Sequence, residues 1–253
     1  AMRMRARDLG IRVPEFIHVL NHNQLSEFLH RVPAPWVLKP RFQASAIGIK
    51  KIETAEQFWQ IVETLGDKQS FNLLERFVPG DIYHVDSIVY ESNVQFTAIQ
   101  KYMLPPMSVA HEGGIFASCS LERGSPEEPI LRSLNDRVIT QFELEQGVSH
   151  TEFIRGKHDG EFYFLETAAR VGGAHIADLV EAAFGINLWT EWAKVASASK
   201  TKPYRLPERR KDYAGLIITL ARQENPDTTG YDDPEIVWRL NKRHHAGLIV
   251  RSL

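Results

Sequence analysis

Two glutamates, Glu152 and Glu166, have the residue type and the spacing for metal chemistry. They lie in apolar segments on either side of Asp159-Gly160, and aromatic and β-branched residues around an Asp-Gly pair are typical of a β-hairpin. A three-residue loop, His158 to Gly160, with its glycine in the left-handed conformation, would place Glu152 directly opposite Glu166. Facing carboxylates repel each other. A divalent cation between them would convert the pair into a site of hard oxygen ligands.

The pairing depends on the loop length. A two-residue Asp-Gly loop would shift the register by one residue and place Glu152 opposite Thr167. We favour the longer loop because it separates an apolar face from a polar face of the hairpin. The apolar face would carry Phe153, Tyr163 and Leu165, and the polar face His150, Glu152, Glu166, Ala168 and Arg170. On spacing alone, two solvated glutamates on an exposed sheet face are an equally good interpretation.

The composition is that of an ordinary globular protein. The 253 residues are 43% hydrophobic and 25% charged, enough for one large domain or two modest lobes. A net charge of −2 gives no electrostatic footprint for nucleic acid or an anionic membrane, and there is neither a signal peptide nor an apolar run of about 20 residues. The single cysteine, Cys119, excludes an internal disulfide and favours a reducing, cytoplasmic compartment.

The expected elements alternate without a regular βα rhythm, which favours an α+β class with large antiparallel parts. A helix from Thr54 to Gly66 is well marked, since Thr54 and Gln57 can form a capping box. Residues 103–124 are expected to be rich in loops. Residues 1–9 resemble the tail of a helix, and we expect the chain to be a piece of a longer protein. Strands are expected at Trp36–Pro40, Ile49–Ile52, Phe71–Val78, Tyr83–Tyr90, Val94–Tyr102, Tyr213–Ala221, Glu235–Leu240 and His245–Val250.

Four motifs in this order resemble the ATP-grasp superfamily, in particular carboxylate–amine ligases related to biotin carboxylase and glycinamide ribonucleotide synthetase. They are Val-Leu-Lys39-Pro, Leu-Leu-Glu75-Arg-Phe-Val-Pro-Gly80, Glu152, and Glu166 followed by Arg170-Val-Gly-Gly. The resemblance covers about Gly10 to Ser199. It implies two α+β lobes with antiparallel sheets that grip a nucleotide. The smaller lobe is expected within residues 1–74 and the larger within 75–253, with an upstream domain of the parent protein absent.

The resemblance implies nucleotide contacts from the first two motifs. Lys39 would contact adenine and the α-phosphate, which suits a compact ammonium group. The polar loop after Pro40 would fold over the phosphates, with Ser45 and Gly48 as candidates. Glu75 and the backbone of the residues after it, Arg76, Phe77 and Val78, would meet the adenine edge.

Other nucleotide contacts follow from later positions. Leu165 would pack on the adenine face. Ile82 stands where the family often has a glutamate that binds ribose, so Asp81 or His84 would have to supply that contact.

Glu152 and Glu166 match the family's metal-binding acidic pair, which implies Mg²⁺, with Mn²⁺ as an alternative, on the ATP phosphates. The family's usual third ligand is an asparagine, and Ala168 stands in its place. His150 is the candidate to compensate. Arg170 matches the catalytic arginine that stabilises the transferred phosphoryl group and the acyl phosphate.

The implied reaction is ATP-dependent ligation. A carboxylate attacks the γ-phosphate of ATP, giving ADP and an acyl phosphate that an amine then captures. The expected partners are small-molecule carboxylate and amine substrates, with a homodimer left open, and neither nucleic acid nor a membrane. The alternatives are a nucleotide-binding module without ligase activity, a bicarbonate-dependent carboxylase, and a metal-dependent hydrolase that uses the acidic pair without nucleotide.

Overall fold

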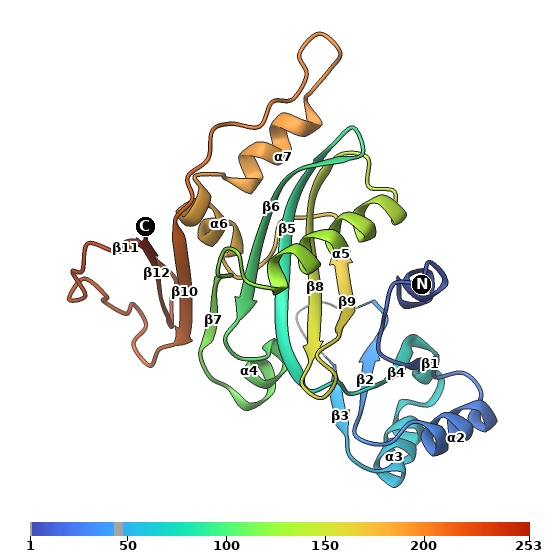
Figure 1. Ribbon diagram of the computed structural model, residues 1–253. Helices are drawn as coiled ribbons and strands as arrows, with labels where there is room; N and C mark the ends of the chain where they lie inside the picture. The colour runs from blue at the N-terminus through green and yellow to red at the C-terminus, as the bar shows by residue number, and fades with distance from the viewer. Residues whose placement is uncertain (1, 43–47) are drawn as a thin grey trace. The chain divides into compact units, whose positions relative to one another are not determined.

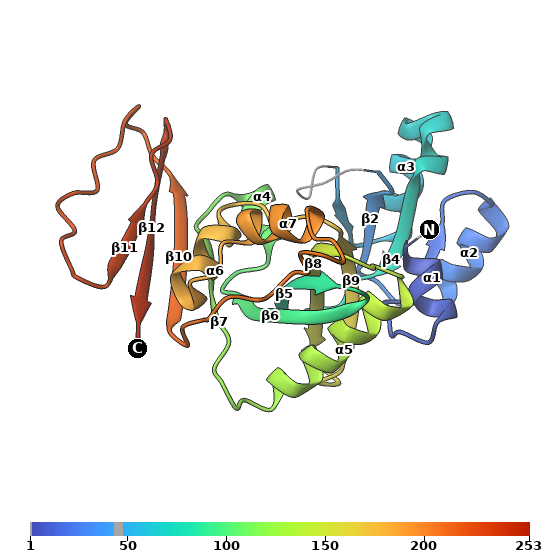
Figure 2. The ribbon, with the colours of Figure 1, turned by 90° about the horizontal axis from the view of Figure 1, so that it is seen from above.

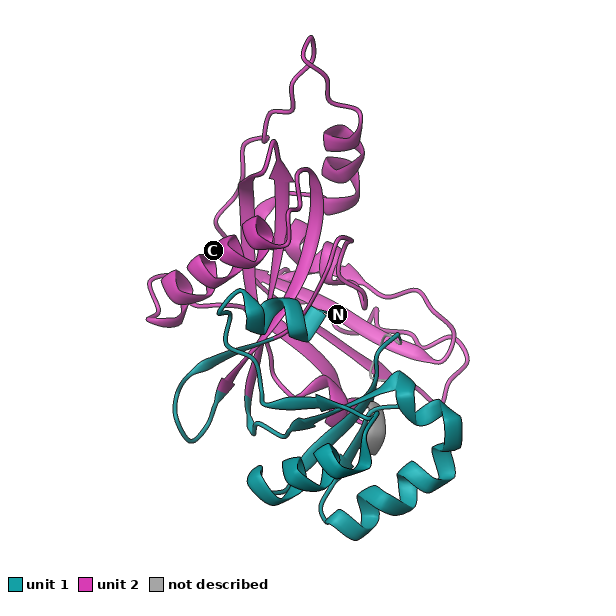
Figure 3. Ribbon diagram, turned by 90° about the vertical axis from the view of Figure 1, so that its right-hand side faces the viewer, with its two compact units in different colours: residues 1–80, 156–164 teal, residues 81–155, 165–253 magenta. Residues whose placement is uncertain are grey.

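The computed structural model describes residues 2–42 and 48–253. The chain forms two compact units (Figure 3). Unit 1 comprises residues 1–80 and 156–164, and unit 2 comprises residues 81–155 and 165–253. Among the described residues, no helix combines the length and the apolar character that crossing a bilayer requires.

Unit 1 is built on a four-stranded antiparallel sheet in the order β1-β4-β2-β3 (Figure 1). Apolar side chains of its helices, among them Leu25 and Phe58, pack against Trp36, Leu38 and Leu74 of the strands. The sheet therefore has one covered face, which fixes the register of β2 against β4. The elements are α1 (Met2–Asp8), β1 (Phe16–His18), α2 (His22–Arg31), β2 (Trp36–Pro40), β3 (Lys50–Ile52), α3 (Ala55–Leu65), the 3₁₀ helix η1 (Gly66–Phe71) and β4 (Asn72–Arg76).

The start of α3 follows the sequence prediction. Thr54 Oγ1 accepts a hydrogen bond from the Gln57 N–H at 3.2 Å, and Gln57 Oε1 accepts one from the Glu53 N–H at 2.8 Å. The glutamine therefore caps the residue before Thr54 rather than Thr54 itself.

Unit 2 holds most of an eight-stranded sheet in the order β11-β12-β10-β7-β6-β5-β8-β9. The pairings from β11 through β5 are all antiparallel. The strands are β5 (Gly80–Tyr90), β6 (Asn93–Tyr102), β7 (Phe116–Ser120), β8 (Gly147–Gly156), β9 (Phe162–Ala168), β10 (Tyr213–Leu220), β11 (Ile236–Arg239) and β12 (His245–Ser252).

Helices cover both faces of this sheet (Figure 2). Helix α5 (Glu127–Gln141) lies on one face, and α6 (Ile176–Phe184) and α7 (Leu188–Ala196) lie on the other. Alternate residues of β6 point to opposite faces, so Phe96, Ala98 and Tyr102 share a core cluster with Ile176 of α6. The face on which a side chain of β6 lies therefore follows from whether its residue number is even or odd.

The segment expected to be rich in loops, 103–124, contains helix α4 (Pro106–Glu112) and strand β7. This corrects the sequence prediction. The residues of β7, Phe-Ala-Ser-Cys-Ser, are mostly small and give a weak strand signal. The strand forms because it fills the space between β6 and β10, which are far apart in the sequence.

The turn between β8 and β9 closes at the backbone hydrogen bond from Gly156 to Glu161, which encloses four residues, 157–160, rather than the three that we predicted. The Gly156 N–H donates to Glu161 O at 2.8 Å, and the Gly160 N–H donates to Gly156 O at 2.9 Å. Gly160 has a φ of 70°, so the left-handed glycine is as expected. The Lys157 N–H donates to Pro79 O at 2.8 Å.

The far end of the same strand pair shows which residues share a face. Thr151 Oγ1 and Thr167 Oγ1 are 2.8 Å apart, so these two hydroxyls lie on one face of β8 and β9. Neighbouring side chains on a strand point to opposite faces, so Glu152 and Glu166 lie together on the other face. Their direct opposition stays a prediction.

Candidate functional site

A buried carboxylate, Glu75, lies on β4 of the unit 1 sheet, next to β2. Its Oε2 accepts a hydrogen bond from Arg3 Nε at 2.9 Å, and its Oε1 lies 3.0 Å from Lys39 Nζ and 3.2 Å from Arg3 Nη2. Glu75 and Lys39 are brought together because β4 and β2 are adjacent, with Glu75 opposite Val37. The structure thus joins two residues that the sequence placed in separate motifs.

The charges around Glu75 keep it ionised. Burial would raise the pKa of this carboxyl, but the Arg3 guanidinium and the Lys39 ammonium outweigh burial and hold the pKa below its usual value. Only 5% of Arg3 is exposed, and its Nη1 also donates to Phe164 O. Sequence reasoning missed Arg3 because a basic residue in a short helix normally faces solvent. Its cluster with Arg5 and Arg7 gave no signal that one of the three is buried.

Of the three residues after Glu75, two use their backbone N–H groups in hydrogen bonds within the fold. The Arg76 N–H donates to Glu15 O at 2.8 Å, and the Phe77 N–H donates to Pro35 O at 3.0 Å. The Val78 N–H has no acceptor within the part of the chain that the structure describes. Of the three expected backbone contacts to adenine, Val78 is therefore the one with a donor that the fold does not use.

Two candidates were expected in the loop after Pro40, Ser45 and Gly48. Ser45 lies outside the described residues. Gly48 has a φ of +73°, and a Cβ at this position would lie 2.9 Å from Pro40 Cγ. Gly48 therefore packs against the residue that follows Lys39, and both its backbone conformation and its lack of a side chain are required there.

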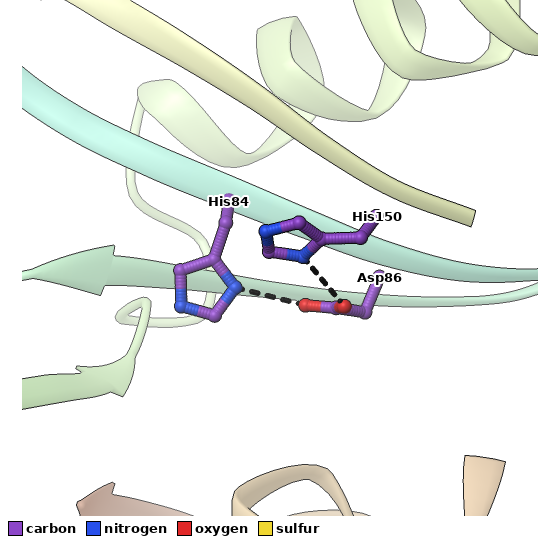
Figure 4. Close-up of side chains that lie close together, drawn as sticks. All are labelled: His84, Asp86 and His150. Carbon is purple, nitrogen blue, oxygen red and sulfur yellow. Dashed lines mark hydrogen bonds and ion pairs between the residues drawn. The ribbon is translucent and has the colours of Figure 1, made fainter. Parts of the chain in front are cut away.

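Unit 2 contains a chain of hydrogen bonds centred on Asp86 (Figure 4). His84 Nδ1 lies 2.8 Å from Asp86 Oδ2, and His150 Nδ1 lies 2.9 Å from Asp86 Oδ1. His84 and Asp86 project from the same face of β5, and His150 comes from β8. The other ring nitrogen of His84 lies 2.7 Å from Ser118 Oγ. Each oxygen of the Asp86 carboxylate thus has its own imidazole.

The charge states follow from burial and pairing. Burial alone would raise the pKa of Asp86, but His150 and His84 hold it well below its usual range. Burial would lower the pKa of His150, but Asp86 and then Glu152 raise it to about 10. Burial dominates at His84 and lowers its pKa. At neutral pH the three hydrogen-bonded residues are therefore a neutral His84, an Asp86 carboxylate and a His150 imidazolium.

Glu152 is the far end of this chain. Its Oε1 lies 3.4 Å from His150 Nε2 and accepts a hydrogen bond from Tyr102 Oη at 2.9 Å. Burial raises the pKa of Tyr102, and the charges of Glu152 and Glu166 raise it further, so the phenol stays a donor. The two donors, Tyr102 and His150, thus both contact Oε1. No described residue donates to Oε2, which leaves this oxygen for a cation.

Gly172, from the predicted Arg-Val-Gly-Gly motif, packs directly on the Asp86–His150 pair. A Cβ at this position would lie 2.9 Å from His150 Nδ1 and 3.0 Å from Asp86 Oδ1. Neither atom belongs to a free side-chain end, because each is fixed by the other. Gly173 has nothing within 4 Å of its Cβ position. Of the two glycines, only Gly172 is required by packing.

The His84, Asp86 and His150 ligand atoms lie within 4.8 Å of one another, the donor set of a transition-metal site. Their contacts argue against that use, because the two Nδ1 atoms and both Asp86 oxygens are already paired with one another. Glu152 and Glu166 fit better as ligands for Mg²⁺, which prefers carboxylate oxygens. The buried cluster then acts as their support.

The remaining predicted residues lie on or next to strands β5 and β9. Asp81, a ribose candidate, forms an ion pair with Lys101 at 2.6 Å and keeps 59% of its side chain exposed. The ribose contact expected of His84 does not fit the structure, because the ring is fully buried and both nitrogens have protein partners. Leu165 is half-buried on β9. Arg170 is exposed, and its Nη1 donates to Val171 O at 2.8 Å.

Comparison with known proteins identifies the family. Residues 32–178 match the ATP-grasp domain family, which is more than half of the chain, and the chain therefore belongs to that family. An L-arginine-specific L-amino acid ligase of Bacillus subtilis is 25% identical over 195 residues, which are 75% of this chain and 46% of the relative.

Two solved structures show the same fold. An L-amino acid ligase from Bacillus licheniformis has a TM-score of 0.74 at 17% identity, and the match covers 98% of this chain and 65% of that chain. The biotin carboxylase domain of a Hydrogenobacter thermophilus 2-oxoglutarate carboxylase, in complex with MgADP, ADP and bicarbonate, has a TM-score of 0.74 at 14% identity, covering 98% and 60%. The chain thus spans about half of the curated relative and under two thirds of these two structures.

Proposed function

We propose that this chain is the ATP-binding catalytic part of an ATP-dependent carboxylate–amine ligase. The observation that supports the proposal is that Glu152 Oε1 takes both donors while no described residue donates to Oε2. Strand parity puts Glu166 on the same sheet face. Family membership and the amino acid ligase relative support the same conclusion. The substrates would be a small carboxylate and a small amine.

We assign nucleotide recognition to the strand pair of unit 1. Lys39 Nζ, held by Glu75, would donate to the α-phosphate and the adenine edge, because an ammonium suits a phosphate oxygen. The unused N–H of Val78 would donate to the adenine ring. Glu75 would act mainly by holding Lys39, since both of its oxygens already face cations. Gly48 would keep the end of the phosphate loop close to Pro40.

Glu152 and Glu166 would hold Mg²⁺. When bound, the ion neutralises charge on the β- and γ-phosphates. Of the side chains near these ligands, Tyr102 and His150 would orient Glu152, because both donate to a single oxygen and leave the second oxygen without a donor among the described residues. The missing asparagine at Ala168 is not replaced by His150, because both His150 nitrogens face carboxylates.

The proposed reaction needs little acid–base chemistry from the protein. The substrate carboxylate attacks the γ-phosphorus of ATP, the bond to the β-phosphate oxygen breaks, and ADP leaves with that electron pair. The amine then attacks the acyl carbon and phosphate departs. Arg170, which is exposed, would stabilise the charge on the transferred phosphoryl group. Positioning and charge stabilisation are the usual sources of rate in such transfers.

The test is calorimetric titration of the chain with ATP and Mg²⁺, with Glu166→Gln and Lys39→Ala as variants. Both variants should bind MgATP at least about tenfold more weakly, the scale of one lost charge-assisted contact. His158→Gln, in the exposed β8–β9 loop, is the control and should bind as the parent does. Unchanged affinity in both site variants would refute the site.

Steady ADP release separates ligation from mere binding. Release that requires both a carboxylate, such as an amino acid, and an amine supports the ligase assignment. Release stimulated by bicarbonate alone would instead identify a carboxylase. Tight MgATP binding without turnover on any tested pair would leave the nucleotide site standing and refute the catalytic assignment for this chain by itself.

A further inference from the structure

Unit 2 has a cavity of about 270 Å³ that the proposed reaction does not use. Its lining includes Phe96, Thr97 and Ile99 of β6, the start of α5, and Arg209 and Lys211. The volume is near the lower end of the range for small-molecule pockets. Ile99 and Lys101 are two residues apart on β6 and so share a face of the sheet, which is the face opposite that of Tyr102.

The cavity is strongly basic in a chain whose net charge is −2. Its lining includes Arg123, Arg132, Arg209 and Lys211 against a single carboxylate, Glu128, four positive charges against one negative. Glu128 is already engaged, because its Oε1 accepts from Arg132 Nη2 at 3.2 Å and its Oε2 from the Gly124 N–H at 2.8 Å. The surplus of positive charge therefore remains.

The cations at the rim lack carboxylate partners within the described chain. Arg209 lies over the Phe96 ring at 5.9 Å, and no ion pair involves Arg209 or Lys211 in the parts that the structure covers. The nearest acidic residue C-terminal to them, Asp212, is taken by Arg210 at 3.2 Å and Arg251 at 3.7 Å. Two exposed cationic side chains thus line the cavity without a carboxylate partner among the described residues.

The edge of β6 adds a backbone donor. The Leu121 N–H donates to Ile99 O at 3.0 Å, so the backbone groups of Ile99 face the β7 side. Alternate residues of an antiparallel strand direct their backbone groups to the same edge, so Thr97 faces that side too. Strand β7 pairs with β6 only over Gln100–Tyr102, so it leaves the Thr97 edge uncovered, and Thr97 lines the cavity.

We propose that this cavity is a second ligand site, separate from the nucleotide and metal residues, that binds a small organic phosphate. Guanidinium groups and a backbone N–H match the several oxygens and double charge of a phosphate. The apolar lining residues, among them Phe96, Ile99 and Phe184, suit an apolar or aromatic body. A monocarboxylate would use fewer of the donors and bind more weakly.

The test is calorimetric titration with phenyl phosphate at fixed ionic strength. The pocket variant is Arg209→Gln with Lys211→Gln, and the matched control is Lys200→Gln with Lys202→Gln, which makes the same charge change at exposed positions of the same segment. We expect the pocket variant to bind phenyl phosphate at least about tenfold more weakly, and the control less than about twofold. Benzoate and inorganic phosphate should both bind the parent less tightly than phenyl phosphate.

A further variant, Lys39→Ala, separates this proposal from the nucleotide site. Phenyl phosphate should bind Lys39→Ala as it binds the parent, whether or not the proposed ligase function holds. Loss of binding in Lys39→Ala, equal losses in the two double variants, no loss in the pocket variant, or no binding to the parent would each overturn the second site. Circular dichroism of all variants checks that these surface substitutions leave the fold unchanged.

Discussion

His150 Nε2 lies 3.4 Å from Glu152 Oε1, two residues further along β8. The contact is possible because residues two apart on a strand share a face. His150 Nδ1 is held in turn by the buried Asp86. A proposed metal ligand is therefore positioned by an imidazolium that the interior of unit 2 keeps charged, and the position of Glu152 depends on residues that never meet a substrate.

The charged state of His150 predicts a pH dependence of stability. Its pKa in the folded chain is about 10, against 6.5 for an unperturbed histidine. The stabilisation from the protonated ring is fully present below the unfolded pKa and is lost as the pH rises towards the folded value. We expect the free energy of unfolding to fall by up to about 1.4 kcal/mol per pH unit between pH 7 and 9.

Urea unfolding at a series of pH values in this window measures the slope. His150→Gln should be less stable than the parent at pH 7 and should lose the slope. His158→Gln, in the exposed loop, should keep it. A parent curve that is flat from pH 7 to 9 would show that His150 is neutral in the folded chain.

Gly172 and Gly173 provide a matched pair of substitutions. Gly172→Ala places a methyl group 2.9 Å from His150 Nδ1 and 3.0 Å from Asp86 Oδ1, whereas Gly173→Ala meets nothing within 4 Å. We expect Gly172→Ala to cost roughly 1–3 kcal/mol of unfolding free energy and to weaken Mg²⁺-dependent nucleotide binding. Gly173→Ala should change both by little. Thermal unfolding with calorimetry distinguishes them, and equal effects would contradict the packing argument.

Much of the fold was predictable because the signals were local. The strand Trp36–Pro40, the long hairpin of β5 and β6, and the cap of α3 follow from alternation and turn chemistry within a few residues. Strand β7 was missed because its stability comes from pairing with β6 and β10 on either side. No pattern within Phe116–Ser120 could report that.

The candidate site was predictable where a motif carried it. Lys39, Glu75, Glu152 and Glu166 were found because their order resembles a family. Arg3 and Asp86 were missed, since a buried arginine in a terminal helix and an aspartate within an apolar strand give no local signal. The contacts with Glu75 and His150 arise only when distant segments are brought together. The loop between β8 and β9 was predicted one residue too short because both lengths suit a left-handed glycine.

Arg3 and Lys39 contact the same carboxylate but should differ in what they support. Arg3→Met leaves the buried Glu75 with less compensation, and we expect a loss of roughly 3 kcal/mol in unfolding free energy. Lys39→Met leaves the Arg3 hydrogen bonds in place, so its main effect should be on ATP affinity. Chemical unfolding and ATP titration of both variants test this division. A larger loss of unfolding free energy in Lys39→Met than in Arg3→Met would contradict this division of roles.

The same carboxylate predicts behaviour in acid. The pKa of Glu75 lies below the 4.5 of an unperturbed glutamate. The stabilisation from its charge is therefore fully present above the unfolded pKa and is lost as the pH falls through the folded pKa. In Arg3→Met the folded pKa should rise and the loss should begin at a higher pH. Unfolding midpoints measured from pH 6 down to 3 check this. Coincident acid profiles for parent and variant would show that Arg3 does not control the ionisation of Glu75.

Gly48 offers a test of the phosphate loop that does not touch a charged residue. Gly48→Ala and Gly124→Ala share nearly the same backbone conformation, with φ of +73° and +76°, but only the first methyl group meets another residue, Pro40 Cγ at 2.9 Å. Both should lose about 1 kcal/mol of stability from the left-handed alanine, and Gly48→Ala should lose more because its methyl group crowds Pro40. Because Pro40 follows Lys39, only Gly48→Ala should also weaken MgATP binding, by roughly tenfold if the lysine shifts away from its phosphate contact. Equal ATP affinity in the two variants, measured by calorimetry, would show that the close approach of Gly48 to Pro40 has no part in nucleotide binding.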